Sequence, residues 1–252
     1  MKKEEGYQTK EKEHFDKLAE STGETWWGST TPAGIRRLRR RAWLIKEKLQ
    51  AFNDPLVLEI GCGTGALSGL LLEETPLLRL IGCDISPKAI EIASKRYRHY
   101  SKARFEIADI TASTYPEECF EAIVGNSILH HLPHQNTLRE CFRILKPGGI
   151  ILFSEPNMIN PQIVIEKNIR IIGKRLQNTD DETAFIRWPL VQLMREIGFN
   201  SVDIRPFDFL HPITPAPLID IVERIGFLIE RLPILKEISG SLWIQGRKPS
   251  SR

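Results

Sequence analysis

The 252-residue chain has few cysteines, and no apolar run is long enough to cross a membrane without interruption by charges. Its charges nearly balance, with 35 Lys and Arg against 32 Asp and Glu, so overall charge gives no argument for nucleic-acid binding. The charged start, Met1 to Glu5, lacks the apolar core of a signal peptide. The composition is that of an ordinary globular protein, and the length suits one α/β domain with additions. We therefore expect a cytoplasmic protein.

The four cysteines predict neither a metal site nor a disulfide framework. Cys62, Cys83, Cys119 and Cys141 are spaced too widely for a compact zinc pattern. Buried, reduced thiols are common in proteins of the cytoplasm. We expect four reduced structural cysteines and no bound metal.

A glycine turn organises the chain. An apolar run from Pro55 reads as a buried strand, ends in the turn Gly61 to Gly65, and is followed by a helical pattern from Ala66. Alternate glycines let the backbone turn tightly and leave room for a ligand. The turn also opens a helix, whose first amide groups are unpaired and partly positive. This pattern predicts a nucleotide-type cofactor site at the carboxyl end of a strand.

Two cofactors fit the turn. Gly61, Gly63 and Ala66 satisfy the loose NAD fingerprint, but the turn has no Lys or Arg, and a carboxylate at Glu59 would repel a pyrophosphate. S-adenosylmethionine has a positive centre and no phosphate, and its carboxylate can use the helix-end amides. Asp84 ends the next strand, where it can accept hydrogen bonds from ribose hydroxyls; the alternative is an N-cap, for which Ser86 is better placed.

Five motifs in order resemble the class I S-adenosylmethionine-dependent methyltransferases. They are the stretches 57–65, 82–86, 105–110, 120–124 and 145–149. The resemblance implies an α/β, Rossmann-like fold with a mostly parallel seven-stranded sheet of order 3-2-1-4-5-7-6, strand 7 antiparallel, and helices on both faces. It also implies cofactor contacts at Glu59, Gly61, Cys62, Gly63, Gly65, Asp84, Ile85, Asp109, Ile110 and Asn126. Asp109 would bond the adenine amino group with Ile110 near the ring, or alternatively cap a loop.

The strand ending at Asn126 is followed by a histidine pair that faces the transferring methyl in this fold. Histidine is the natural general base near neutral pH, and methylation of a hydroxyl requires loss of its proton. His131 or His130 is therefore a candidate base, although in many family members this segment only shapes the loop. Methyl transfer otherwise requires mainly alignment and desolvation.

Four further residues are candidate substrate contacts. Glu155 and Asn157 follow the next strand on the same rim, or else cap the connection to the helix that follows. Trp26 and Trp27 lie beside glycines in a loop before the first strand. They would belong to a lid over the site, or would anchor the N-terminal segment to the domain.

A helix predicted from Pro32 to about Gln50 has an apolar stripe and an arginine-rich face. The stripe is Ile35, Leu38, Ala42, Ile45 and Leu49, and the opposite face carries Arg36, Arg37, Arg39, Arg40 and Arg41. Arginine forks bind phosphate, so a phosphorylated acceptor, an anionic lipid or RNA would suit this face. The alternative is a solvated face.

An insertion at about 208–240 precedes the final strand, where a plain family member has a short hairpin. It carries a helical stripe of Leu218, Ile221, Val222, Ile225, Leu228, Ile229 and Leu232, widened by Ile219 and Phe227. Three interpretations remain open: a cap over the acceptor pocket, docking on a membrane surface, or a homodimer interface.

The sequence thus predicts an N-terminal helical lid segment, 1–50, and a methyltransferase core, 51–252. Its expected function is methyl transfer from S-adenosylmethionine to a small-molecule or lipid-linked acceptor, at oxygen, in a protein that is cytoplasmic or associated with a membrane surface. The alternatives are an RNA methyltransferase that uses the arginine helix, an NAD-dependent oxidoreductase, and a non-catalytic cofactor-binding protein. No separate RNA-binding domain supports the first.

Overall fold

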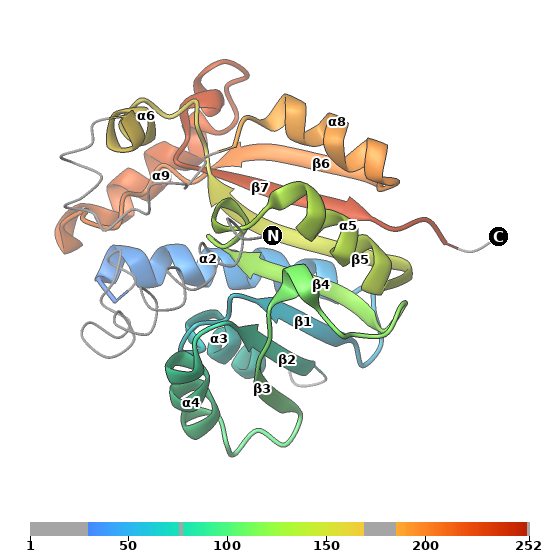
Figure 1. Ribbon diagram of the computed structural model, residues 1–252. Helices are drawn as coiled ribbons and strands as arrows, with labels where there is room; N and C mark the ends of the chain where they lie inside the picture. Colours follow the sequence, from blue (N-terminus) through green and yellow to red (C-terminus); the bar gives the residue numbers. More distant parts are fainter. Residues whose placement is uncertain (1–29, 76–77, 169–184, 251–252) are drawn as a thin grey trace.

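The computed structural model describes residues 30–75, 78–168 and 185–250, and in these residues the strands form a single seven-stranded sheet (Figure 1). The strands are β1 (Leu56–Ile60), β2 (Arg79–Asp84), β3 (Ala103–Ile107), β4 (Phe120–Asn126), β5 (Leu145–Pro156), β6 (Asn200–Phe207) and β7 (Ser241–Arg247). Their order is 3-2-1-4-5-7-6, and β7 is antiparallel to β5 and β6. The predicted order and direction are confirmed.

The α-helices of the described residues are α2 (Pro32–Leu49), α3 (Ala66–Glu74), α4 (Pro87–Arg96), α5 (His134–Ile144), α6 (Pro161–Asn168), α8 (Arg187–Ile197) and α9 (Ile219–Ile229). Two of the helices, α2 and α4, begin with a side-chain N-cap followed by proline. The Thr31 hydroxyl accepts a hydrogen bond from Gly34 N at 3.0 Å, and the Ser86 hydroxyl accepts one from Ala89 N at 3.1 Å. Ser86 therefore caps α4, as expected, and Asp84 is left for other contacts.

The central strands are buried on both faces, which explains why they read as nearly continuous apolar runs. Successive side chains alternate between the faces. Leu58 and Ile123 pack into a core with α5 and α8, whereas Val57 and Ala122 pack into a second core with α2 and α3. Figure 1 shows these two helix layers on opposite sides of the sheet.

Helix α2 belongs to the second core. Ala42, Ile45 and Leu49 are at most 2% exposed and pack in one cluster with strand residues and α3, whereas Ile35, at the start of the predicted stripe, is 41% exposed. The predicted boundary at residue 50 therefore divides a layer that is continuous in the structure. Of the proposed lid, residues 1–29, including Trp26 and Trp27, lie outside the described residues.

The insertion between β6 and β7 contains α9 and two short 3-10 helices, η4 (Ala216–Leu218) and η5 (Leu235–Ile238). It lies, with α6, on the side of the sheet to which the parallel strands point (Figure 1). Asn157 and Asn160 hold its end, because their side-chain amides donate to the Ser239 and Ile238 carbonyls at 2.9 and 2.7 Å. Much of the predicted apolar stripe is exposed rather than packed on the domain.

Candidate functional site

Only glycine fits the two ends of the turn that follows β1. Gly61, Gly63 and Gly65 have φ of 63°, 52° and 87°, a conformation that other residues rarely adopt. A Cβ at Gly61 would lie 2.4 Å from the Ile128 side chain, and one at Gly65 would lie 2.5 Å from the Tyr97 ring. A Cβ at Gly63 would meet nothing within 4 Å. The middle of the turn therefore faces open space, as a ligand cradle requires.

Helix α3 begins in this turn with its amide end available. Its N-cap, Gly65, has no side chain that could accept the first amide hydrogens. The N-terminal amides of a helix carry partial positive charge and favour an anionic group. A carboxylate is an anion of the kind that such a helix start binds.

Asp84 joins the glycine turn to the end of β2. Its Oδ2 accepts a hydrogen bond from Gly63 N at 2.9 Å, and its Oδ1 accepts one from Ser86 N at 2.9 Å. Each carboxylate oxygen has a second lone pair, so these bonds fix the carboxylate and leave acceptor capacity for ribose hydroxyls. The predicted ribose role of Asp84 fits this position, and Ile85 beside it is half-buried.

Glu59 is buried in the strand rather than exposed to the turn. It is 3% exposed, and its Oε2 accepts a hydrogen bond from the Ser68 hydroxyl at 2.5 Å. Burial raises the pKa of Glu59 to about 8, against the opposing effect of the Ser68 bond. At neutral pH the group is therefore largely protonated, so the argument that its charge repels a pyrophosphate was wrong. The absence of Lys and Arg from the turn still stands against a pyrophosphate.

Asp109 caps the short 3-10 helix η2 (Ile110–Ala112). Its Oδ1 accepts hydrogen bonds from Thr111 N at 2.8 Å and from the Thr111 hydroxyl at 2.7 Å. The capping role that the sequence left open is thus present, and the adenine contact stays a prediction. Ile110 is 3% exposed and packs in the core.

Asn126 supplies a buried acceptor at the end of β4. Its Oδ1 is buried and has no hydrogen-bond partner within the described part of the chain. Such an atom is costly unless a ligand or water satisfies it. A carbonyl oxygen beside an anion-binding helix start suits a ligand that has both an ammonium and a carboxylate. The donor set therefore fits S-adenosylmethionine.

The loop after β4 is wrapped around the carboxylate of Glu155. Glu155 is 1% exposed; its Oε1 accepts from Leu129 N at 2.8 Å and Ile128 N at 3.1 Å. Its Oε2 lies 2.7 Å from Nδ1 of His130. Because a carboxylate that already accepts two amide bonds acts as an acceptor, Nδ1 carries the proton and Nε2 is the basic nitrogen of His130.

The two histidines are both buried and lie together. His130 and His131 are 7% and 5% exposed, and their ring centroids are 4.1 Å apart. Strand register brings Glu155 to them, because Asn126 of β4 pairs with Ser154 of β5. The sequence singled out Glu155 as a substrate contact and missed this partnership, which no local pattern signals.

Asn157 serves the chain's own connection. It is 1% exposed, its Nδ2 donates to the Glu237 and Ser239 carbonyls at 2.8 and 2.9 Å, and its Oδ1 accepts from Ile159 N at 3.2 Å. These bonds correspond to the alternative role predicted for Asn157, which is to cap the connection to the following helix. Its substrate contact stays a prediction.

The four cysteines are free thiols: Cys62, Cys83 and Cys141 are buried, and Cys119 is partly exposed. Cys62 lies within the glycine turn, and its cofactor contact stays a prediction. Burial raises the pKa of the Cys62 thiol well above its usual value, so the thiol itself is unreactive. Within the described ranges no group of three or more His, Cys, Asp or Glu could hold a metal.

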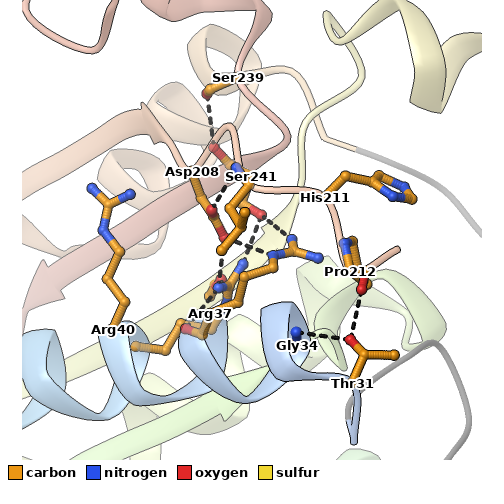
Figure 2. A network of polar contacts seen from close by, with 12 residues as sticks. Thr31, Gly34, Arg37, Arg40, Asp208, His211, Pro212, Ser239 and Ser241 are labelled. Atoms are coloured by element: carbon orange, nitrogen blue, oxygen red, sulfur yellow. Dashed lines mark hydrogen bonds and ion pairs between the residues drawn. The ribbon is translucent and has the colours of Figure 1, made fainter. Parts of the chain in front are cut away.

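The arginine face of α2 binds the insertion. Arg37 and Arg41 both bond the Asp208 carboxylate, at 2.8 and 2.7 Å, and Figure 2 shows Arg37 of α2 beside Asp208. Arg41, only 4% exposed, also donates to the hydroxyls of Ser154 and Ser241 at 2.9 Å each. Burial lowers the pKa of Arg41 to about 10, and the two arginines hold the pKa of Asp208 well below its usual value despite its burial.

Two more arginines of this face pair with α9. Arg40 makes a two-pronged bond to Glu230, at 2.8 and 2.6 Å, and Arg36 bonds Asp220 at 2.6 Å. The Arg40 guanidinium also lies 4.5 Å from the centre of the Phe227 ring. These pairs occupy the guanidinium groups that a phosphate would need, so the phosphate-binding interpretation loses its support for these four residues, and the solvated-face alternative holds only for Arg36, whose side chain is 46% exposed. Complementary acids of the insertion neutralise them, and of the five arginines only Arg39 remains an exposed residue without an ion pair in the described chain.

The comparisons with known proteins centre on the same stretch. Residues 57–149 match the family described as "Methyltransferase domain". A malonyl-[acyl-carrier protein] O-methyltransferase of Paenibacillus sp. (strain JDR-2) is 35% identical over 107 residues, which are 40% of this chain and 39% of that protein. A tRNA N(3)-methylcytidine methyltransferase, trm141, of Schizosaccharomyces pombe is 31% identical over 133 residues, 48% of this chain and 54% of that protein.

A solved structure resembles the chain over nearly its whole length. The N-methyltransferase NodS from Bradyrhizobium japonicum WM9, in complex with S-adenosyl-L-homocysteine, has a TM-score of 0.62 and 18% identity, over 95% of this chain and 98% of that one. At this identity the likeness shows the fold alone. The chain spans less than two thirds of the two curated relatives, and the three proteins are an O-, a tRNA and an N-methyltransferase. The shared stretch therefore does not select an acceptor.

Proposed function

Because the chain belongs to the class I S-adenosylmethionine-dependent methyltransferases, we propose that it methylates an oxygen of a small-molecule or lipid-linked acceptor, with His130 accepting the proton. The observation that carries this proposal is the bond between His130 and the buried carboxylate of Glu155. Assignment of oxygen follows from the base, since a neutral amine attacks without first losing a proton.

The cofactor would supply an electrophilic methyl group on a sulfonium and leave as S-adenosyl-L-homocysteine. Asp84 would hold the ribose, Asn126 Oδ1 would accept from the ammonium, and the start of α3 would face the carboxylate. Glu59 sits behind the turn and would respond to the added positive charge by releasing its proton, because a nearby cation favours the ionised carboxyl.

The chain's part in the reaction is orientation and proton transfer. His130 would take the proton of the acceptor hydroxyl at Nε2, while its Nδ1–H would stay bonded to Glu155. The carboxylate fixes the ring orientation and stabilises the imidazolium that forms. A base positioned in this way contributes roughly 10²- to 10⁴-fold to a rate.

The acceptor class is inferred from the surroundings of the site. The insertion and α6 lie on the side of the sheet to which the parallel strands point, and the insertion exposes apolar residues there (Figure 1). A small-molecule or lipid-linked acceptor suits that setting. The case for RNA rested on the arginine face of α2, and that support is lost because four of its arginines are paired within the chain.

The first experiment would incubate the protein with methyl-labelled S-adenosylmethionine and a cell extract, then separate organic phase, aqueous small molecules, RNA and protein. Label in the organic phase or in aqueous small molecules supports the proposal and decides between the two acceptor types. Label in RNA or protein would contradict it. Asp84→Ala is the control that should abolish labelling by loss of cofactor binding.

The base is tested once an acceptor is in hand. His130→Gln should lower kcat by roughly 100-fold or more while the affinity for S-adenosyl-L-homocysteine stays within about twofold. His99→Gln, an exposed histidine ring next to Tyr100, is the matched control and should keep full activity. A His130→Gln enzyme with unchanged kcat would show that this histidine only shapes the loop.

A further inference from the structure

The insertion turns an apolar face outward. Ile221, Ile225, Leu228 and Leu232 follow one another at spacings of four, three and four residues, so they share one side of α9 and its C-terminal extension. All four are exposed, with Leu228 at 61%. Leu218 before them and Ile234 after them, 83% exposed, extend the row. We call these six residues the insertion apolar face.

The side of α9 that faces the domain is unusually polar. Glu223 lies 3.6 Å from Arg36, and Glu230 bonds Arg40, while Ile219 and Gly226 fill the space between. Although Ile219 and Val222 pack inward, most of the large apolar side chains of this helix therefore face outward, unlike the ordinary arrangement. Solvated single apolar residues are normal, but six exposed large apolar residues within one short segment favour an interaction surface.

The charges beside the row are positive. Arg224 and Arg231 are exposed on one flank of α9 and form no ion pair with any residue of the described ranges. The acids of the helix, Asp220, Glu223 and Glu230, are already paired with arginines of α2. An apolar stripe flanked by free arginines, with its acids neutralised, is the pattern of a helix that lies in the interface of an anionic bilayer.

We propose that the insertion apolar face docks the protein on an anionic membrane surface, with Arg224 and Arg231 at the level of the lipid headgroups. A second copy of the chain fits this face less well, because a self-contact would bring like charges together. The described helices include none long and apolar enough to span a membrane. Docking is thus peripheral, on the side where the parallel strands end, and does not depend on the acceptor or on the proton-accepting role of His130.

The test is partitioning of the full chain onto vesicles of phosphatidylcholine, with and without phosphatidylglycerol, measured by flotation without cofactor or acceptor. The wild type should bind the anionic vesicles, and binding should weaken as salt rises. Leu228→Asp should lower the partition coefficient roughly tenfold or more, since burial of a leucine is lost. Arg224→Ala and Arg231→Ala should each lower it about fivefold.

Trp43→Asp is the matched control, because Trp43 is 51% exposed on α2, outside the insertion apolar face. It should bind vesicles as the wild type does. Circular dichroism and S-adenosyl-L-homocysteine affinity confirm that each variant is folded. A folded wild type that leaves the vesicles unbound, or a Leu228→Asp variant that binds equally well, would overturn the proposal. The proposal would also be overturned if light scattering showed a wild-type dimer that Leu228→Asp dissociates, while the vesicles remain unbound. The insertion apolar face would then bind a second copy of the chain.

Discussion

Replacement of Asp208 by asparagine tests how α2 is held to the insertion. The Asp208 side chain is 2% exposed and faces Arg37 and Arg41, whose side chains are 20% and 5% exposed. Oδ2 accepts from both arginines, and Oδ1 accepts from Leu210 N at 3.2 Å. An amide cannot serve both sides, because one of its two positions becomes a donor that faces other donors.

The expected cost follows from burial. Arg41 keeps its bonds to Ser154 and Ser241 but loses its only carboxylate among the described residues. Breaking a buried ion pair by removing one partner costs about 3–5 kcal/mol. For a chain of this size that corresponds to a fall in melting temperature of roughly 10 °C.

The assay is urea and thermal unfolding, followed by circular dichroism, of Asp208→Asn beside Glu230→Gln and Asp220→Asn. These acids all pair with arginines of α2, but the Glu230 side chain is 15% exposed and the Asp220 side chain 73%. The loss of unfolding free energy should therefore be largest for Asp208→Asn, smaller for Glu230→Gln and not measurable for Asp220→Asn, whose ion pair is exposed. A cost below about 1 kcal/mol for Asp208→Asn would refute the reasoning.

Acid titration gives an independent check. The arginines hold the folded-state pKa of Asp208 below its ordinary value of 3.8. The unfolded state therefore binds more protons near that pH, and the stabilisation is complete above about pH 4 and is lost as pH falls further. The stability difference between wild type and Asp208→Asn should thus shrink on acidification below pH 4. A difference that stays constant there would contradict the assignment of charge to this group.

Two further predictions concern the glycine turn and the acid behind it. Glu59→Gln should flatten the dependence of the unfolding free energy on pH. The folded-state pKa of Glu59 is raised from 4.5 to about 8, so between these pH values the folded wild type binds more protons than its unfolded state. The unfolding free energy of the wild type should therefore fall by on the order of 3–5 kcal/mol as pH rises from 4.5 to about 8, which urea unfolding at a series of pH values would measure. An unchanged slope would contradict this. Gly65→Ala should lower the melting temperature more than Gly63→Ala, because only the Gly65 substitution places a Cβ against the Tyr97 ring. Gly63→Ala should mainly weaken the binding of S-adenosyl-L-homocysteine, as measured by calorimetry. Equal melting temperatures would show that the ring gives way.

The sheet could be predicted because its strands carry their own signals. β1, β2 and β4 are apolar on both faces, and the turns between them are marked by glycine, proline and N-cap residues. The Ser86 cap and the helix start at Pro32 are local features, and the structure confirms them. Strand ends are less well marked in the sequence: β5 begins as early as Leu145, because its pairing with β4 extends to the Phe120 position.

The candidate site was predictable only where one strand and its turn supply it. The glycines and Asp84 are brought together by neighbouring strands in the expected order. The bond between Glu155 and His130 depends instead on the register of β4 against β5 and on the path of the intervening loop. Neither quantity is encoded by a local pattern, so the sequence singled out the carboxylate without its bond to His130, and the substrate contact of Glu155 stays a prediction.

The reversed orientation of α9 shows what a hydrophobic stripe leaves undecided. Spacing identifies which residues share a side of a helix, but it does not say whether that side meets the core. The decisive information lay in a second helix: Arg36 of α2 pairs with Asp220 and Glu223, and Arg40 pairs with Glu230 at the end of α9. Burying the arginine face without those acids would cost more than exposing the leucines and isoleucines. Glu223 and Glu230 therefore turn toward α2, and the apolar row faces outward. The exposure of that row is thus a consequence of charge pairing between segments more than 180 residues apart in the sequence.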